Sequence, residues 1–274
     1  MMLQNDLKKL DIKNPFNEAP IFYAGTVSST MDVSRELEQE NAPHGTVIVA
    51  DFQKKGRGRN GRPWQGKVGE NLVFTVLLRF GDFSAIPKAI TLKTGLAAAL
   101  AVEDFVALFH STGRKGALSL SCAVKWPNDL MVNSKKIAGV LTESDGRNVF
   151  IGIGVNVGQT EFPAELREKA GSLALAMGLT APVFTAAVRD NRFHLMELIL
   201  RRLMRELNTE DWQERLVGRL YKRGELVRFV AGRAGSGDAV HGVLVGVKED
   251  GSLLILPRGA ETPTVFVTGE LDVY

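Results

Sequence analysis

Hydrophobic and polar positions in the first half of the chain form runs of two different spacings. Three runs rich in Val, Ile, Phe and Thr predict β-strands, at 21–27, 45–53 and 71–80. After the first of them comes Ser-Ser-Thr, and the residues that follow have the spacing of an amphipathic helix over 32–41. The Ala- and Leu-rich stretch from Pro87 to His110 predicts a second, longer helix.

The middle of the chain returns to strand-like runs. Three short strands are predicted, the last two as a hairpin, at 123–127, 129–132 and 137–144. The apolar run at 148–158 predicts a strand buried on both faces. Beyond it the pattern is mostly helical over 163–220, with one long amphipathic run from Phe184 to Leu207.

The spacing of strands and turns changes near residue 224. From there to residue 274, short strands alternate with turns, which predicts a small all-β module, a five-strand barrel of SH3 type. In the preceding part helices and strands interleave without strict βαβ order, so the fold class expected is α+β with a mixed sheet. We expect a polar leader, a main domain and a C-terminal module, at 1–19, 20–221 and 222–274, and residues 111–121 as a surface connection.

Composition and charge narrow the classes of function. The 274 residues carry a net charge of +3, which is too small an excess to indicate nucleic-acid binding. The single cysteine, Cys122, excludes an internal disulfide framework and has the apolar neighbours of a small buried hydrophobe. No membrane-spanning run is apparent, so the chain is expected to be soluble and cytoplasmic.

The strongest chemical signal is Gly-Arg-Gly-Arg-Asn-Gly-Arg at 56–62, followed by Pro and Trp64. Glycines let the backbone approach a ligand closely, and successive N–H groups can then line an anion. Arg57, Arg59 and Arg62 supply forked donors suited to phosphate or carboxylate. No Walker A pattern follows. Taken alone, the segment is equally well explained as a solvated basic loop or an RNA contact.

Two further segments add polar groups at strand ends. Lys-Trp-Pro-Asn-Asp-Leu at 125–130 places an amide and a carboxylate where ligands gather in mixed sheets, although Pro-Asn-Asp is also ordinary turn chemistry. In Asn-Ser-Lys-Lys-Ile-Ala-Gly at 133–139, Lys135 and Lys136 follow the hairpin turn and Gly139 permits close approach. A lysine pair alone usually marks a solvated face.

Glycines also interrupt the buried strand at 148–158. Gly152 and Gly154 weaken its packing, which requires a close ligand or backbone as compensation, and Asn156 at its end can hold a metal or a ribose. At the start of the first helix, Ser29 is predicted to be the N-cap, spaced with Asp32 as a capping box. Ser29 and Thr30 can at the same time bind the polar head of a ligand.

In this order and at these spacings, the five segments resemble the biotin–protein ligase family. The resemblance extends over almost the whole chain, to Gly-Glu-Leu-Val-Arg-Phe-Val and the final Gly-Glu pair. It implies a catalytic domain related to class II aminoacyl-tRNA synthetases and an SH3-like C-terminal module. The implied reaction uses ATP with Mg²⁺ to form biotinyl-5′-AMP and then transfers biotin to a lysine of a biotin carboxyl carrier protein.

The resemblance also assigns site residues. Those that match the biotin side are Ser29, Thr30, Gln53, Arg57, Gly58, Arg59 and Lys136. Those that match the ATP side, or support it, are Gly56, Arg62, Trp64, Lys125, Asn128, Asp129, Gly139 and Asn156. Lys136, Arg59 and Arg57 are the expected catalytic groups, Mg²⁺ is expected with the ATP oxygens, and no protein ligand to it is assigned.

Some features depart from the family pattern. Met31 stands where many members carry Asn, which removes one polar contact near the biotin end, and the connection at 111–121 is longer than expected. The leader is too short for a helix-turn-helix domain, so the non-repressor class is expected. Neither a nucleic acid nor a membrane is an expected partner, and monomer and homodimer stay open.

Two alternative functions are disfavoured by the residues present. A lipoate or octanoate ligase is disfavoured because its Arg-Arg-x-Ser-Gly-Gly-Gly signature is missing. A nucleic-acid-binding regulator is disfavoured because no aromatic residues interleave with the basic ones.

Residues 54–69 carry several like charges and glycines, so we expect the charges to repel one another and the loop to be mobile when no anion is bound. Trp64 is expected to contact adenine once the loop closes.

Overall fold

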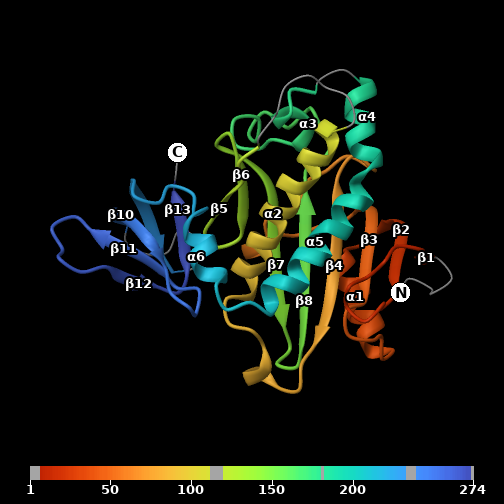
Figure 1. The fold of residues 1–274 in the computed structure, drawn as a ribbon, viewed down its shortest axis with the longest axis horizontal. Helices are drawn as coiled ribbons and strands as arrows, with labels where there is room; N and C mark the ends of the chain where they lie inside the picture. Colours follow the sequence, from red (N-terminus) through yellow and green to blue (C-terminus); the bar gives the residue numbers. More distant parts are fainter. Residues whose placement is uncertain (1–6, 112–119, 180–181, 233–238, 273–274) are drawn as a thin grey trace.

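A computed structural model of the protein describes residues 7–111, 120–179, 182–232 and 239–272 (Figure 1). Its main domain is built on an eight-stranded mixed sheet of order β1-β2-β3-β4-β8-β7-β6-β5. The β2–β3 pairing is parallel and the other pairings of this sheet are antiparallel. The strands are β1 Lys8–Leu10, β2 Ile21–Val27, β3 Val47–Gln53, β4 Leu72–Arg79, β5 Ala123–Lys125, β6 Asp129–Val132, β7 Lys135–Ser144 and β8 Asn148–Val155. The expected α+β class with a mixed sheet is confirmed.

Helices cover both faces of this sheet because its strands are apolar on both. The helices are α1 Thr30–Gln39, α2 Ile90–Ser111, α3 Leu173–Ala176, α4 Pro182–Asp190, α5 Arg192–Leu207 and α6 Trp212–Val217. Helices α2 and α5 lie side by side on the face drawn toward the viewer (Figure 1). On the other face, Val33 and Leu37 of α1 pack against Ile48 and Val73. The amphipathic run predicted from Phe184 to Leu207 is two helices, because the chain breaks at Asn191.

The helical region around α2 is long and apolar enough to cross a membrane by composition. The segment Phe83–Leu108 has a mean hydropathy of 1.3 in its best window, and 61% of that window is buried inside the protein. The Ala and Leu side chains of α2 are therefore used in packing against the sheet and α5, as in the core helix of a globular domain.

The expected polar leader is more structured than its sequence indicated. Strand β1 pairs with β2, and the amide of Asn14 donates to the carbonyls of Ala19 and Gly45 at 2.9 Å. Phe16 is only 1% exposed and belongs to the main core. One aromatic residue in a polar stretch gives no periodic signal, so the sequence did not indicate that residues 7–19 pack onto the main domain. Most of the predicted connection at 111–121 lies outside the described residues.

The C-terminal part is a separate five-stranded antiparallel sheet of order β12-β11-β10-β9-β13. Its strands are β9 Leu226–Ala231, β10 Ala239–Val247, β11 Leu253–Pro257, β12 Thr264–Phe266 and β13 Gly269–Asp272. All five predicted strands are present, but among the described residues β12 and β13 remain the two edges, and closure into a barrel is not seen.

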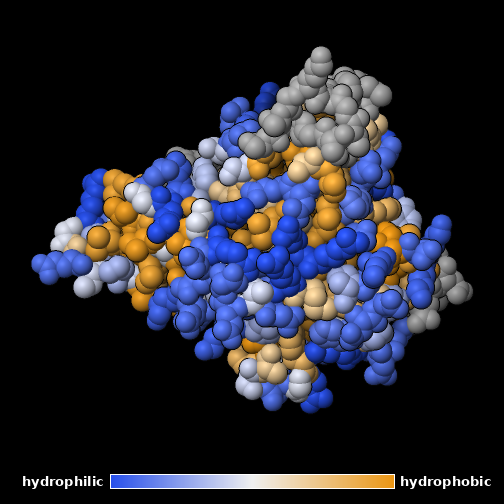
Figure 2. Space-filling view, in the orientation of Figure 1, coloured by the Kyte–Doolittle hydropathy of each residue, from blue (hydrophilic) through white to orange (hydrophobic). Residues whose placement is uncertain are grey.

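Aromatic contacts and exposed apolar side chains characterise this second sheet. Trp126 of the main domain lies 5.9 Å from Phe229 between ring centroids, and its indole N–H donates to the carbonyl of Gly251 at 2.9 Å. The surface of this lobe also carries hydrophobic residues (Figure 2). Its exposed large hydrophobics are Leu226, Val243, Val245, Val265 and Val267.

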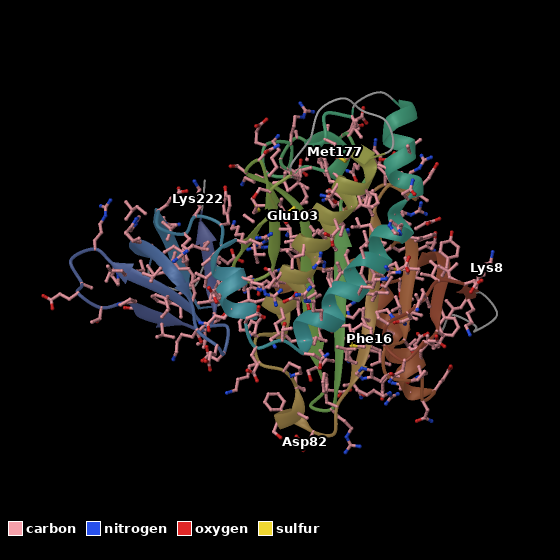
Figure 3. All side chains as sticks on the ribbon, in the orientation of Figure 1. Lys8, Phe16, Asp82, Glu103, Met177 and Lys222 are labelled. Atoms are coloured by element: carbon pink, nitrogen blue, oxygen red, sulfur yellow. The ribbon has the colours of Figure 1, made fainter. Side chains whose placement is uncertain are left out.

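The burial of Phe16 predicts a stability effect that a polar leader would not have. Phe16→Ala should lower the free energy of unfolding by about 3–5 kcal/mol, because it leaves a cavity in the main core. Phe83→Ala is the matched control: Phe83 is 75% exposed and follows Asp82 at the outer tip of the molecule (Figure 3), so it should cost less than about 0.5 kcal/mol. Chemical denaturation measures both, and equal small effects would contradict the assigned burial.

Candidate functional site

A cavity of about 460 Å³ lies where the Gly/Arg segment crosses the sheet beside β7 and β8. The predicted site residues that line it are Ser29, Thr30, Gln53, Arg57, Gly58, Arg59, Arg62, Trp64, Lys125, Asn128, Asp129, Lys136, Gly139 and Asn156. Gly56 is the predicted residue that does not. A Cβ at Gly56 would stand 3.0 Å from the Gln53 amide and 3.2 Å from the Trp64 carbonyl, so this glycine permits the loop to lie against Gln53.

Hydroxyl and amide groups gather at the start of α1. The Gln53 Oε1 accepts from the backbone N–H of Thr30 at 2.8 Å and from its hydroxyl at 3.1 Å, and the Thr30 and Thr75 hydroxyls are 2.8 Å apart. Ser29 is the N-cap, accepting from the N–H of Met31 at 3.2 Å. The predicted capping box with Asp32 is wrong, because the Asp32 carboxylate accepts from Arg57 instead, at 2.8 Å. This end of the cavity can bind a small neutral polar group.

Three of the cations of residues 54–69, Arg57, Arg62 and Lys67, are paired with carboxylates from distant parts of the chain. Arg57 contacts Asp32 at 2.8 Å and Glu143 at 3.5 Å. Arg62 donates to both oxygens of Glu270 in β13, at 2.7 and 2.8 Å, and Lys67 reaches Glu161 at 2.8 Å. The sequence-based argument from mutual repulsion is therefore wrong at these positions, since each positive charge has its own counter-charge.

Arg59 differs from its neighbours in the loop. Within the described residues it contacts no carboxylate; it donates to the Asn128 side-chain oxygen and the Gly269 carbonyl, both at 3.4 Å. Burial lowers the pKa of its guanidinium, although the group stays charged. A half-buried cation with two long hydrogen bonds is a suitable partner for an incoming anion.

Trp64 explains two of the strand glycines. Gly139 of β7 and Gly154 of β8 are direct partners in the sheet, and the Trp64 ring lies on this flat stretch of backbone. A Cβ at Gly154 would stand 2.6 Å from the ring, and one at Gly139 would stand 3.4 Å from it. Gly152 instead makes room for Met31, whose Cε would lie 3.1 Å from a Cβ there.

The lysine pair after the hairpin turn divides between two environments. Lys136 points into the cavity, where its Nζ lies 2.7 Å from Asp129 and 5.9 Å from the Trp64 ring centroid. Lys135 turns the other way and donates to the Arg167 carbonyl at 2.8 Å. The Asn128 side-chain N–H donates to the Val140 carbonyl at 2.9 Å, which directs its oxygen toward Arg59.

Asn156 has a structural role that the sequence did not indicate. It is 6% exposed, and its side-chain N–H donates to the Gly171 carbonyl at 2.9 Å. It therefore anchors the segment after β8 against the cavity. In the described ranges, no group of three His, Cys, Asp or Glu side chains is arranged to hold a metal ion.

Cys122 lies outside this cavity and is only 1% exposed. Burial, with the nearby charge of Glu103, raises the pKa of its thiol to about 12. It is protonated at neutral pH, as expected of a small buried hydrophobe and not of a catalytic thiolate.

Several lining residues were missed by sequence reasoning. An apolar wall comes from the segment after β8, through Phe162, Pro163 and Leu166. In the sequence, the only indication of this wall was a few apolar residues inside a polar stretch. Glu270 of β13 also lines the cavity; the final Gly-Glu pair belongs to the family pattern, but its contact with a loop more than two hundred residues earlier could not be inferred.

The chain is similar to known proteins in sequence and in fold. The model of the Biotin/lipoate A/B protein ligase family matches residues 23–159. The chain is 39% identical over 165 residues to the bifunctional ligase/repressor BirA of Bacillus spizizenii, covering 58% of this chain and 47% of that protein. It is 30% identical over 214 residues to the biotin–[acetyl-CoA-carboxylase] ligase of Paracoccus denitrificans, covering 76% of this chain and 82% of that protein. The chain thus spans about half the length of the first relative and most of the second.

Among solved structures, the chain resembles the biotin protein ligase from Aquifex aeolicus in complex with biotin and ATP. The TM-score is 0.68 at 28% identity, covering 92% of this chain and 97% of that one. A point mutant of the same ligase in complex with biotin gives a TM-score of 0.72 at 27% identity, with the same coverage of both chains. The likeness includes the C-terminal sheet as well as the main domain.

The glycine floor under Trp64 leads to a first prediction for the site. Gly154→Ala should push the Trp64 ring off the sheet, because the new methyl would overlap it. Trp126 and Trp212 are 3% and 5% exposed, so any gain in quenching of tryptophan fluorescence by acrylamide reports Trp64. Gly25→Ala, a strand substitution with nothing within 4 Å, is the control. Equal quenching in both variants would contradict the contact.

The contact between Arg62 and Glu270 leads to a second prediction. Glu270→Gln should make tryptic cleavage after Arg57 and Arg59 about two- to fivefold faster, since the amide keeps the shape but loses the charge attraction of a partly exposed pair that holds the loop. The cleaved bonds are identified by mass spectrometry. Glu261→Gln, between β11 and β12 at the opposite edge of the sheet, is the control and should leave the cleavage rate unchanged. If the Glu270→Gln variant is cleaved as slowly as the parent, β13 does not hold the loop.

Proposed function

Since the chain belongs to the Biotin/lipoate A/B protein ligase family, we propose that it is a biotin–protein ligase. It forms biotinyl-5′-AMP from biotin and ATP and then transfers biotin to a lysine of a biotin carboxyl carrier protein. The observation that carries this proposal is the cavity that joins the hydroxyl and amide groups of Ser29, Thr30 and Gln53 to Lys136 and the loop arginines. The relative from Paracoccus denitrificans bears the name of this activity, and the Aquifex aeolicus structure holds biotin and ATP.

The hydroxyl and amide end of the cavity suits the ureido ring of biotin. A ureido group needs both donors and acceptors, and Ser29, Thr30 and Gln53 offer both. Met31, 3% exposed, lies beside them over Gly152 and gives apolar surface instead of the amide that many relatives carry. In this proposal Arg57, Gly58 and Arg59 complete the biotin side from the loop.

Lys136, Arg59 and Arg57 neutralise charge in the first step. The biotin carboxylate attacks the α-phosphorus of ATP, the new C–O–P link forms, and pyrophosphate leaves with the bonding electrons. Two anions meet in this step, so preorganised cations contribute most of the catalysis. Lys136 would exchange its Asp129 partner, 2.7 Å away, for the carboxylate and α-phosphate oxygens. Mg²⁺ enters as the complex with ATP and neutralises part of the phosphate charge.

The rest of the cavity is assigned to the nucleotide. Trp64 offers a ring face and Phe162 an apolar wall for adenine, while Asn128, Asp129 and Lys125 lie beside the phosphates. Arg62, Gly56, Gly139 and Asn156 shape and support this side. Closure of the loop excludes water, and water would otherwise hydrolyse the adenylate.

In the second step the acceptor lysine amine attacks the acyl carbon of the adenylate and AMP leaves. The lysine belongs to a carrier protein, and the enzyme is assigned to the cytoplasm, where such carriers act.

The proposed domains are a catalytic unit at 20–221, related to class II aminoacyl-tRNA synthetases, and an SH3-like module at 222–274 that supports the active-site face. A short leader at 1–19 precedes them.

The overall activity is tested by incubation with biotin, ATP–Mg²⁺ and a biotin-carrier domain, followed by streptavidin blotting. Parallel reactions with lipoate and octanoate, read by mass spectrometry of the acceptor, address the related ligases. We expect a mass increase with biotin alone among the three acids. Modification by lipoate or octanoate without biotin would place the chain in the other branch of the family.

Lys136 gives the sharpest test of the first step. Lys136→Ala should slow biotin-dependent pyrophosphate release at saturating biotin by about 10²–10³-fold, because the charge is required as the transition state forms. Lys135→Ala is the matched control, since Lys135 is the adjacent lysine and faces the Arg167 carbonyl outside the cavity. A Lys136 variant within threefold of the parent would remove this lysine from the mechanism.

A further inference from the structure

A second cavity of about 370 Å³ adjoins the first one. The two share one partition, formed by Arg59, the Trp126–Asn128 turn, Val140 and Leu141. The second cavity lies on the far side of this partition, between the start of α2 and the C-terminal sheet. The same six residues thus border both cavities, and the second cavity lies next to the one assigned to the adenylate.

The lining of the second cavity combines aliphatic side chains and hydroxyls with two charged residues, Arg59 and Asp250. Its wall carries Ile90, Leu92 and the hydroxyls of Thr91 and Thr142, which bond to each other at 3.0 Å and so are not free to bind a ligand strongly. Among the described residues that line it, two are charged: Arg59 at the partition and Asp250 at the exposed rim. This pattern suits an aliphatic chain that carries a basic group.

The outer lip of the cavity belongs to the C-terminal sheet and is firmly seated. The Trp126 indole N–H donates to the Gly251 carbonyl at 2.9 Å. Gly251 has φ +87°, and a Cβ there would lie 2.9 Å from the Ala89 side chain, so the turn fits only without a side chain. Val267 completes the lip and is 79% exposed. The C-terminal sheet therefore forms part of an entrance.

We infer that this second cavity is the entrance through which the acceptor lysine reaches the adenylate, an inference that rests on the proposed function. The four-carbon stem of lysine matches the apolar wall, and Asp250 attracts the arriving ammonium. Farther in, the positive charge of Arg59 favours the neutral amine, which is the nucleophile. The amine loses one proton to water at the rim. Its nitrogen then bonds the acyl carbon, the C–O bond to phosphate breaks, and the second proton leaves with the AMP phosphate.

The departing pyrophosphate is the competing occupant. It carries several negative charges and requires several cations, as in other phosphate sites. The described lining offers a single cation, Arg59, and places the carboxylate of Asp250 at the only exposed end. The charge balance therefore favours a cationic side chain over an anion.

The test separates the two half-reactions in the full-length chain. Val267→Trp places a large side chain over the mouth, and Val265→Trp, on β12 and outside the cavity, is the matched control. Asp250→Asn removes the rim charge while keeping an oxygen for the Ser252 N–H, 2.9 Å away. Biotin-dependent ATP–pyrophosphate exchange measures the first step, and transfer to a biotin-carrier domain measures the second.

We expect exchange within twofold of the parent in all three variants. Transfer should fall at least tenfold in kcat/KM for Val267→Trp, about threefold through KM for Asp250→Asn, and less than twofold for Val265→Trp. Capture of the adenylate by hydroxylamine, which is small enough to pass the first cavity, should stay unchanged. Equal transfer in the two Trp variants would overturn the inference, and a fall in exchange with Val267→Trp would assign the cavity to the phosphates. No exchange in the parent would instead refute the proposed function, and the inference with it.

Discussion

The contact between the Trp64 ring and the paired glycines of β7 and β8 is the constraint on which the geometry of the site depends. Two strands that lack side chains at one register position leave a flat patch of backbone, and only a planar group fills it closely. By occupying this patch, Trp64 holds the Gly/Arg segment over the sheet and sets Arg59 beside Asn128. The same placement puts the ring near Lys136, so one aromatic contact helps to position two of the three cationic groups of the proposed chemistry, Arg59 and Lys136.

Ion pairs hold two cations of the proposed chemistry, Lys136 and Arg57, in place before a nucleotide binds. The side chains of their partners, Asp129 and Asp32, are 20% and 39% exposed, so a phosphate can replace them from the solvent side. A nucleotide would then bind by replacing existing ion pairs, and the released carboxylates would face water. Affinity gained in this way is small for each pair, but the positions of the cations are fixed in advance. Preorganisation of this kind contributes to rate more than to binding.

The sequence predicted those parts of the fold that local patterns encode. Strand runs, the N-cap at Ser29 and the hairpin before Lys136 follow from short-range chemistry, and motif residues at strand ends converge because strand ends meet at one edge. Packing between residues far apart along the chain could not be predicted from the sequence. Phe16 in a polar stretch and the break at Asn191 inside an apolar run depend on neighbours far along the chain. Asp32 was assigned to a capping box because its true partner, Arg57, lies in another segment.

The C-terminal sheet shows most clearly why the site could not be derived from motifs alone. Among its contacts with the main domain, two meet the motif segments: Glu270 accepts from Arg62 of the loop, and Gly251 accepts from Trp126 of the Lys-Trp-Pro-Asn-Asp turn. These two points lie on the two segments that carry the strongest chemical signals. A small sheet attached at both of them fixes the distance between the loop and the turn, and Arg59 and Asn128 meet between them. The module thus contributes geometry to a reaction in which none of its own side chains is assigned a chemical step.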